Sequence, residues 1–424
     1  MLLILYFLIL LIVYRKYKSV VTILILLQVI SLAAMFVVGR DYPIDTPVKL
    51  FQIILTAFVL TIVIVPWKNM GAIQKIYCTN EHKIKNLTII LLIISFFVFI
   101  VLLIIVIAVA LFIQDMVQFR NVESVMDEFL RTYLPSSVRK ASLLAYYLYQ
   151  LSYFLIPLHF YYLSKRNFSM AILCFIMSLN IILFGLTFFS RASLINYFLI
   201  YGILFYMFKD TLGKRVKRNV LIGFIMLGIW MAIRIMGISS GRFDDDIIYR
   251  DTIPSYSKIQ DNVVLYNYLS YMSQWYYNGM EVLDNYKYET MRGEISFNFI
   301  LNALSYIGIV DYEHRSYIEL RQKLLLNNWD QFIGLVPGWI YDFGYLVSLI
   351  LAWCYNYIIR KLKPYNNSLS ISNALLLVLL IQIPLFSIFY SALGGILYTF
   401  LLWIPINLYL RERIPIISDI NDSK

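Results

Sequence analysis

The sequence predicts an all-α integral membrane protein, and three observations lead to this fold class. Of the 424 residues, 61% are apolar and only 14% are charged, whereas soluble domains carry roughly a quarter charged residues. Apolar runs such as 20–38 and 87–113 reach the ~20 residues that cross about 30 Å of hydrocarbon. These runs are continuous rather than alternating, which favours helices over a membrane barrel.

About eleven apolar segments are the expected transmembrane helices. We place them at 1–14, 19–39, 48–66, 87–113, 141–163, 168–189, 192–208, 219–238, 336–359, 369–390 and 393–410. The first eight form a membrane domain over 1–238, and the last three form a second one over 336–424 with a short cytoplasmic tail. One large external loop, 239–335, lies between spans 8 and 9. The first apolar run precedes its basic cluster, which is the reverse of a secretory signal, so we expect a short first span.

Charge separates the alternate loops. One set holds 20 basic and five acidic residues, a net charge of +15, while the rest of the chain holds 16 basic and 20 acidic residues, a net charge of −4. Cytoplasmic loops carry an excess of Lys and Arg. The basic loops are therefore expected to be cytoplasmic, with the N-terminus outside and the C-terminus inside, and no nucleic-acid partner is expected.

Two segments on the predicted outer side have helical apolar spacing. Residues 114–140 are amphipathic and are expected to lie along the membrane surface. In the large loop, apolar residues from Leu265 to Leu283 follow the same period. Ile295–Val310 is a near-continuous apolar stretch of 16 residues, which we interpret as buried or re-entrant. A single extra crossing there would move the basic segment 358–363 to the outside.

The sequence lacks the motifs of nucleotide binding, and its cysteine pattern does not indicate disulfides or a zinc site. There is no P-loop and no Gly-rich nucleotide fingerprint. Two of the three cysteines lie inside apolar runs, so neither disulfides nor a zinc site is expected. The acidic run Asp244–Asp246 resembles a metal-binding pair, but such runs are more often solvated or paired with arginines. We therefore expect no metal and no cofactor, and any chemistry takes place in or outside the membrane.

Arginines at the outer membrane boundary are the main binding candidates. Arg191 lies at a turn between two apolar runs, Arg234 lies near the outer end of the eighth span, and Arg242 and Arg250 follow in the loop. Charges at membrane depth are costly, and guanidinium groups bind phosphates bidentately. We expect them to bind a lipid-linked diphosphate. The alternative is that they snorkel to the interface or pair with nearby aspartates.

General-base and sugar-binding candidates lie in and beside the large loop. His314 and Glu313 could accept a proton from a sugar hydroxyl, or form a solvated turn. His159, in the fifth span, is more simply an interhelical histidine. Aromatic side chains suit stacking on sugars, although a membrane-interface belt explains them equally well. The sugar-binding candidates are Trp275, Tyr276 and Tyr341.

A short motif follows the large loop. The chain reads Tyr341-Asp342-Phe343-Gly344 at the start of a span, and Ser190-Arg191 stands between two earlier spans. With the number of spans, the position of the loop and the small cytoplasmic loops, this resembles the bacterial O-antigen (Wzy-type) oligosaccharide repeat-unit polymerases. The chain departs from that family at Val336-Pro337-Gly338, where small hydroxyl residues are expected.

The resemblance implies a metal-independent membrane glycosyltransferase in the bacterial cytoplasmic (inner) membrane. At the outer face it would transfer a growing glycan from undecaprenyl diphosphate to a hydroxyl of the next lipid-linked repeat unit. Arg191 and Arg234 would bind the diphosphates. Asp342 would be either the base or an orienting partner for an arginine. A flippase and a chain-length regulator are the protein partners that the resemblance implies.

Two other functions remain open on the sequence. An O-antigen ligase, or another integral-membrane glycosyltransferase, would need the same arginines and differ only in its acceptor. A lipid-linked oligosaccharide flippase or other transporter would place charged residues near the membrane midplane, often on helices broken by Gly or Pro. Here the charges lie at the outer boundary, and transport does not need so large a loop.

Overall fold

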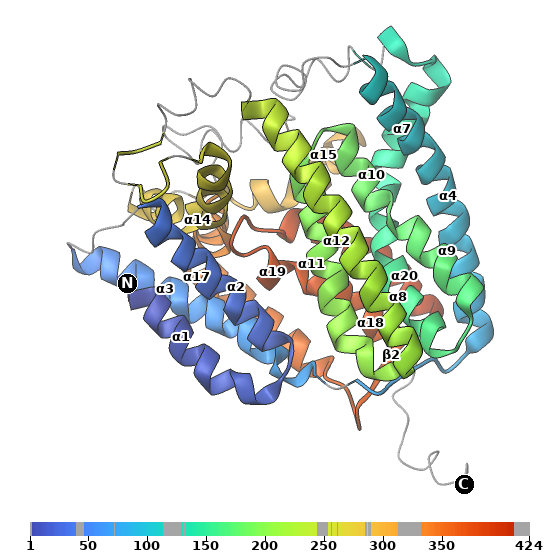
Figure 1. The fold of residues 1–424 in the computed structure, drawn as a ribbon, viewed down its shortest axis with the longest axis horizontal. Coiled ribbons are helices and arrows are strands. Elements are labelled where there is room, and N and C mark those ends of the chain that lie inside the picture. Colours follow the sequence, from blue (N-terminus) through green and yellow to red (C-terminus); the bar gives the residue numbers. More distant parts are fainter. Residues whose placement is uncertain are drawn as a thin grey trace.

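Long helices run between two opposite ends of the molecule in this computed structural model (Figure 1). The structure describes all residues except 1, 40–45, 72, 113–128, 130–131, 244–252, 256, 261, 285, 287–289, 313–331 and 411–424, and it leaves out the side chains of 191, 235–236, 238–243, 299, 303 and 306. The helices are α1 (Leu2–Tyr14), α2 (Val20–Val38), α3 (Pro47–Ile64), α4 (Glu81–Phe112), α7 (Ser136–Leu148), α8 (Ser152–Ser164), α9 (Phe168–Ser178), α10 (Asn180–Thr187), α11 (Arg191–Phe208), α12 (Lys214–Phe243), α14 (Val263–Asp284), α15 (Glu294–Tyr306), α17 (Leu335–Lys361), α18 (Ile371–Leu380), α19 (Gln382–Leu385) and α20 (Leu393–Leu410). Short 3-10 turns occupy Arg15–Tyr17, Val65–Asn69, Tyr149–Leu151 and Lys209–Thr211, and the strands are β1 (Lys75–Tyr77) and β2 (Ser368–Ser370).

Membrane-length apolar helices dominate the described part of the chain. Nine helical segments there are long and apolar enough to cross a bilayer. The all-α membrane class predicted from the sequence is confirmed. Two of the eleven predicted spans are helical but shorter, since α1 has 13 residues and α18 with α19 covers only Ile371–Leu385.

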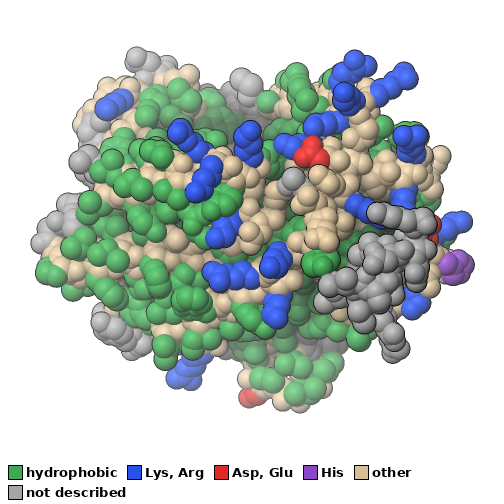
Figure 2. All heavy atoms as spheres, turned by 90° about the horizontal axis from the view of Figure 1, so that it is seen from below, with side chains coloured by type: hydrophobic (Ala, Val, Ile, Leu, Met, Phe, Trp, Pro, Cys, Tyr) green, Lys and Arg blue, Asp and Glu red, His purple; other side chains and the backbone are tan. Residues whose placement is uncertain are grey.

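One end of the bundle gathers the basic loops. There β1 and β2 pair in parallel, which joins two loops far apart in the sequence. Lys83 Nζ donates to the carbonyl of Tyr409 at 2.9 Å, and Lys165 Nζ lies 2.5 Å from Glu81 Oε1. Viewed from below, this face shows many Lys and Arg side chains and few Asp or Glu (Figure 2). We call it the basic face.

The predicted external loop contains helices that pack on the membrane helices. Helix α14 lies against α2 and α17. Trp275 Nε1 donates to Ser31 Oγ at 2.6 Å, and that hydroxyl donates to the carbonyl of Met272 at 2.5 Å. Tyr276, Met280 and Leu283 are buried, whereas Leu265, at the start of the predicted period, is 44% exposed. The predicted helix is therefore seen, and the apolar face of its second half contacts the bundle.

The two other predicted outer segments are described in part. The apolar stretch 295–310 begins as α15 and ends in a turn where Ile307 and Ile309 are exposed. The predicted surface helix at 114–140 lies mostly outside the described residues. Its described end includes the ring of Tyr133, which stacks on Phe112 with centroids 4.7 Å apart.

Helix α17 is broken at Gly344, whose φ of 81° and ψ of 171° belong to a region that essentially only glycine occupies. The break frees the carbonyls of Tyr341 and Asp342 from their helical partners. They accept instead from the backbone N–H groups of Met291 at 3.0 Å and Gly293 at 3.1 Å. These bonds fix the segment that leads into α15, because buried backbone groups need partners.

The start of α17 is held by the non-helical segment between α19 and α20. The N–H of Gly334 donates to the carbonyl of Phe389, and that of Leu335 to the carbonyl of Ser387, each at 3.0 Å. Gly334 has a φ of 77°, and a Cβ there would lie 2.9 Å from the ring of Trp275. Only glycine fits this close approach, so the entry to α17 is fixed by both backbone and packing.

Candidate functional site

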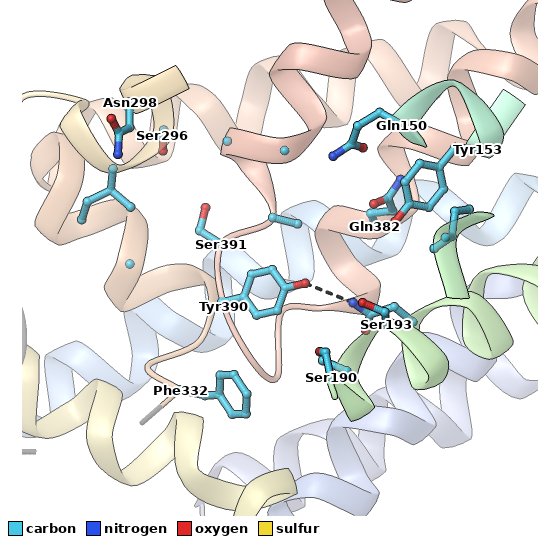
Figure 3. Close-up of a pocket in the computed structure, with 18 of the residues that line it drawn as sticks. Gln150, Tyr153, Ser190, Ser193, Ser296, Asn298, Phe332, Gln382, Tyr390 and Ser391 are labelled. Atoms are coloured by element: carbon cyan, nitrogen blue, oxygen red, sulfur yellow. Dashed lines mark hydrogen bonds between the residues drawn. The ribbon is translucent and has the colours of Figure 1, made fainter. Parts of the chain in front are cut away.

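A cavity of about 630 Å³ lies where these irregular segments meet (Figure 3). Its walls come from the α7–α8 junction, the starts of α10 and α11, helix α15, the entry to α17, and the segment from α19 to the start of α20. The polar lining residues are Tyr149, Gln150, Tyr153, Ser190, Ser193, Asn196, Ser296, Asn298, Asn302, Gln382, Tyr390 and Ser391. None of the lining side chains that the structure describes is charged.

Hydroxyl and amide groups within the cavity bond to one another. Asn196 Nδ2 donates to Tyr390 Oη at 3.2 Å, and Gln150 Nε2 donates to Tyr149 Oη at 3.0 Å. Each phenol oxygen that accepts an amide proton still carries an O–H group of its own. The cavity thus presents neutral donors and acceptors in mixed order, which complements a ligand that bears hydroxyl groups.

The turn between α10 and α11 brings Ser190 to the cavity. The N–H of Ser190 donates to the carbonyl of Gly185 at 2.8 Å, and a Cβ on Gly185 would collide with Ser193 Cβ at 2.3 Å. Arg191 is the first residue of α11, and its neighbours Ser190 and Ala192 both line the cavity. Its backbone therefore lies at the cavity wall.

Of the other predicted arginines, the structure describes the side chain of Arg234 alone. Arg234 is exposed on α12 and is not a lining residue of the cavity. Arg242 belongs to α12 by its backbone only, and Arg250 lies outside the described residues. The base candidates Glu313 and His314 also lie outside them. Within the described part of the chain, no three His, Cys, Asp or Glu side chains cluster in a way that could hold a metal.

Asp342 caps helix α15 from a neighbouring helix. Its side chain is 1% exposed, and its Oδ1 and Oδ2 accept from the backbone N–H groups of Ile295 at 3.2 Å and Ser296 at 3.0 Å. Such first-turn N–H groups have no partner within their own helix, and a negative charge is favourable there. Asp342 is not a lining residue, but Ile295 and Ser296 are. The geometry therefore gives Asp342 a positioning contact with a wall of the cavity.

The predicted sugar-binding aromatics are packed away from the cavity. Trp275 and Tyr276 are 1% and 3% exposed, and Trp275 uses its indole N–H on Ser31. Tyr341 packs beside Tyr286 with ring centroids 6.0 Å apart. None of the three predicted aromatics is a lining residue.

The aromatic and amide side chains that do line the cavity come from predicted spans. Tyr149, Gln150, Tyr153, Gln382 and Tyr390 all interrupt apolar runs. Polar groups inside a span were the signal that could have found them, because such groups are costly in hydrocarbon unless they serve a function.

Comparison of the chain with known protein families, with curated proteins and with solved structures gives no match.

Gly395 offers a direct test of the cavity. A Cβ added at this lining residue of α20 would meet nothing within 4 Å, so a larger side chain enters open space. Gly395→Leu is expected to abolish activity by filling the cavity. The melting temperature should not fall, since replacing a helical glycine by alanine or leucine gains about 0.5–1 kcal/mol. The matched control is Gly223→Leu on the exposed side of α12, where a Cβ also meets nothing. Normal activity of well-folded Gly395→Leu would show that the cavity is not the functional site.

Proposed function

We propose that the protein polymerises undecaprenyl-diphosphate-linked oligosaccharide repeat units into O-antigen or a related surface polysaccharide. The observation that carries this proposal is the uncharged cavity of about 630 Å³, lined by hydroxyl and amide groups, that begins at the Ser190-Arg191 turn. Neutral groups of this kind bind sugar hydroxyls, and the arginine beside them suits the diphosphate of the lipid carrier.

The position of the cavity along the helices supports the same proposal. Helices α11, α17 and α20 all begin beside the cavity and end toward the basic face. With the basic face in the cytoplasm, as charge asymmetry favours, the cavity is on the outer side of the membrane. This orientation requires α1 and the α18–α19 pair to complete eleven crossings. A lipid-linked glycan that has reached the outer leaflet would then meet the cavity.

The transfer needs little from the protein beyond placement and charge. The oxygen of an acceptor hydroxyl attacks the anomeric carbon of the growing chain, and the bond from that carbon to the diphosphate oxygen breaks. The electron pair stays on the diphosphate, and the hydroxyl proton passes to a base, for which Glu313 and His314 are the candidates. Arg191 and the free N–H groups at the start of α11 would stabilise the departing diphosphate. No metal is needed for this charge balance.

A gel of surface glycan from a deletion strain and its complemented control tests the function. If long chains vanish and carriers bear a single repeat unit, the protein is the polymerase. If chains still polymerise but stay on the lipid carrier, the protein is a ligase that uses another acceptor. If no glycan reaches the outer face, the protein is a transporter and the proposal is wrong.

A further inference from the structure

Two polar side chains in the cavity are almost fully buried and yet lack a partner for one functional atom. Tyr153 and Gln382 are each 8% exposed, and both line the cavity. No described residue forms a hydrogen bond with the hydroxyl of Tyr153. Gln382 Nε2 donates to the carbonyl of Val378 at 3.1 Å, which leaves its carbonyl oxygen Oε1 without a donor in the described structure.

These two side chains come from neighbouring helices. Helix α8 starts near Tyr153 and descends toward the basic face, whereas α18 rises from that face and is followed by Gln382. The two helices pack against each other in opposite directions, so the start of α8 and the end of α18 meet. Figure 3 shows both side chains at the cavity, on the side away from the α15 residues Ser296 and Asn298.

Tyr153 Oη and Gln382 Oε1 are accessible from the cavity, so a bound ligand can form hydrogen bonds with them. The two atoms are of different kinds. The phenol of Tyr153 can donate and accept, whereas the Oε1 of Gln382 can only accept. A ligand that satisfies both must carry groups that donate as well as accept.

This donor and acceptor pattern selects among ligand classes. A phosphate oxygen only accepts, so it would meet the Tyr153 O–H well and the Gln382 Oε1 badly. Gln382 Oε1 could coordinate a metal cation, but the described lining residues include no carboxylate to balance the charge of the cation. A sugar hydroxyl donates one hydrogen bond and accepts others, so it satisfies both groups.

We propose that Tyr153 and Gln382 form a subsite that binds neutral saccharide hydroxyls and determines which sugar the cavity accepts. The subsite deepens the proposed function, on which its link to a glycan substrate rests. The diphosphate then lies near the Ser190-Arg191 turn, which Figure 3 shows beside Gln382 on the same side of the cavity. In this proposal Tyr153 and Gln382 contact the sugar. The buried Trp275 and Tyr276 do not.

Thermal stability gives the first test, and it does not require a known substrate. Tyr153→Phe removes only a hydroxyl that has no partner, and Gln382→Met keeps the side-chain length. Both variants are expected to melt at the wild-type temperature or above it. The control is Tyr197→Phe, because the Tyr197 hydroxyl lies 2.8 Å from Ser178 Oγ inside the bundle. Its melting temperature should fall by about 1–3 °C. A similar fall in both cavity variants would show a structural role and overturn the proposal.

Ligand binding gives the second test, on the full-length protein in a detergent without a sugar headgroup. Melting temperatures are measured with glucose, galactose, N-acetylglucosamine and inorganic pyrophosphate. We expect at least one neutral sugar to stabilise the wild type and the Tyr197→Phe control. Each cavity variant should lower the affinity for that sugar about 3- to 10-fold. Any effect of pyrophosphate on the melting temperature should be unchanged.

The outcomes separate this inference from the proposed function. Three results would overturn the subsite. The first is sugar binding that is unchanged in both variants, and the second is a wild type that binds no sugar. The third is stabilisation by pyrophosphate, in place of sugar, that the variants abolish. Sugar binding that depends on Tyr153 and Gln382 supports the subsite even where a deletion strain still makes long chains. In that case only the polymerase proposal fails, and the protein handles a saccharide in another reaction.

Discussion

Asp342→Ala is expected to detach the start of α15 and to inactivate the protein. The change removes both acceptors of the Ile295 and Ser296 N–H groups, which become buried donors without a partner. Loss of a helix cap together with charged hydrogen bonds costs about 2–4 kcal/mol. Because Ile295 and Ser296 line the cavity, the wall should shift and activity should fall with stability. The measurements are the melting temperature of the purified protein and glycan polymerisation in the complemented deletion strain.

Asp342→Asn distinguishes a capping residue from a general base. Asparagine keeps one acceptor oxygen but turns an NH2 group toward the second N–H. If Asp342 caps α15, the variant should lose part of its stability and part of its activity. If Asp342 is the general base, the variant should be inactive with a normal melting temperature, and that result would contradict the capping role. The control is Asp210→Ala, whose exposed carboxylate lies 3.4 Å from Lys217 Nζ and should contribute under about 1 kcal/mol.

The helices could be predicted because apolar length alone specifies them in a membrane. Each of the eleven apolar segments contains a described helix, since hydrocarbon offers the backbone no other partners. The breaks were harder to predict. Gly344 stands in an apolar run that continues on both sides of it, and only the donors from Met291 and Gly293 make a break there favourable. Those donors are more than forty positions away in the sequence.

The position of the Ser190-Arg191 turn could be predicted because a single local feature decides it. Ser190-Arg191 is a polar turn between two apolar runs, so its position at a helix start follows from the sequence. The role of Asp342 depends on where α15 begins in space, which no local pattern encodes. Trp275 fits a sugar platform or a buried anchor equally well by composition. Its indole N–H lies 2.6 Å from Ser31 Oγ, so the fold uses it as an anchor.

Arg191→Ala is expected to lower polymerisation by about 10²–10³-fold while leaving membrane insertion unchanged. Arg191 opens α11 between two residues that line the cavity, so we expect it to contact the diphosphate that leaves the sugar. As the bond to the anomeric carbon breaks, negative charge grows on the diphosphate. A fixed guanidinium group in a site without water stabilises that charge more in the transition state than in the ground state. The assay is the amount of long-chain glycan at equal protein level in the membrane.

Arg191→Lys tests whether the fork of the guanidinium matters beyond its charge. A lysine ammonium is a point charge and cannot make two parallel hydrogen bonds to one phosphate, so this variant should also be poor. Arg218→Ala is the matched control, because this arginine lies near the start of α12 at the basic face. It should polymerise normally. Full activity of well-inserted Arg191→Ala would remove the diphosphate contact from the α10–α11 turn, and would leave the neutral cavity as a sugar site whose anion is bound by another part of the chain.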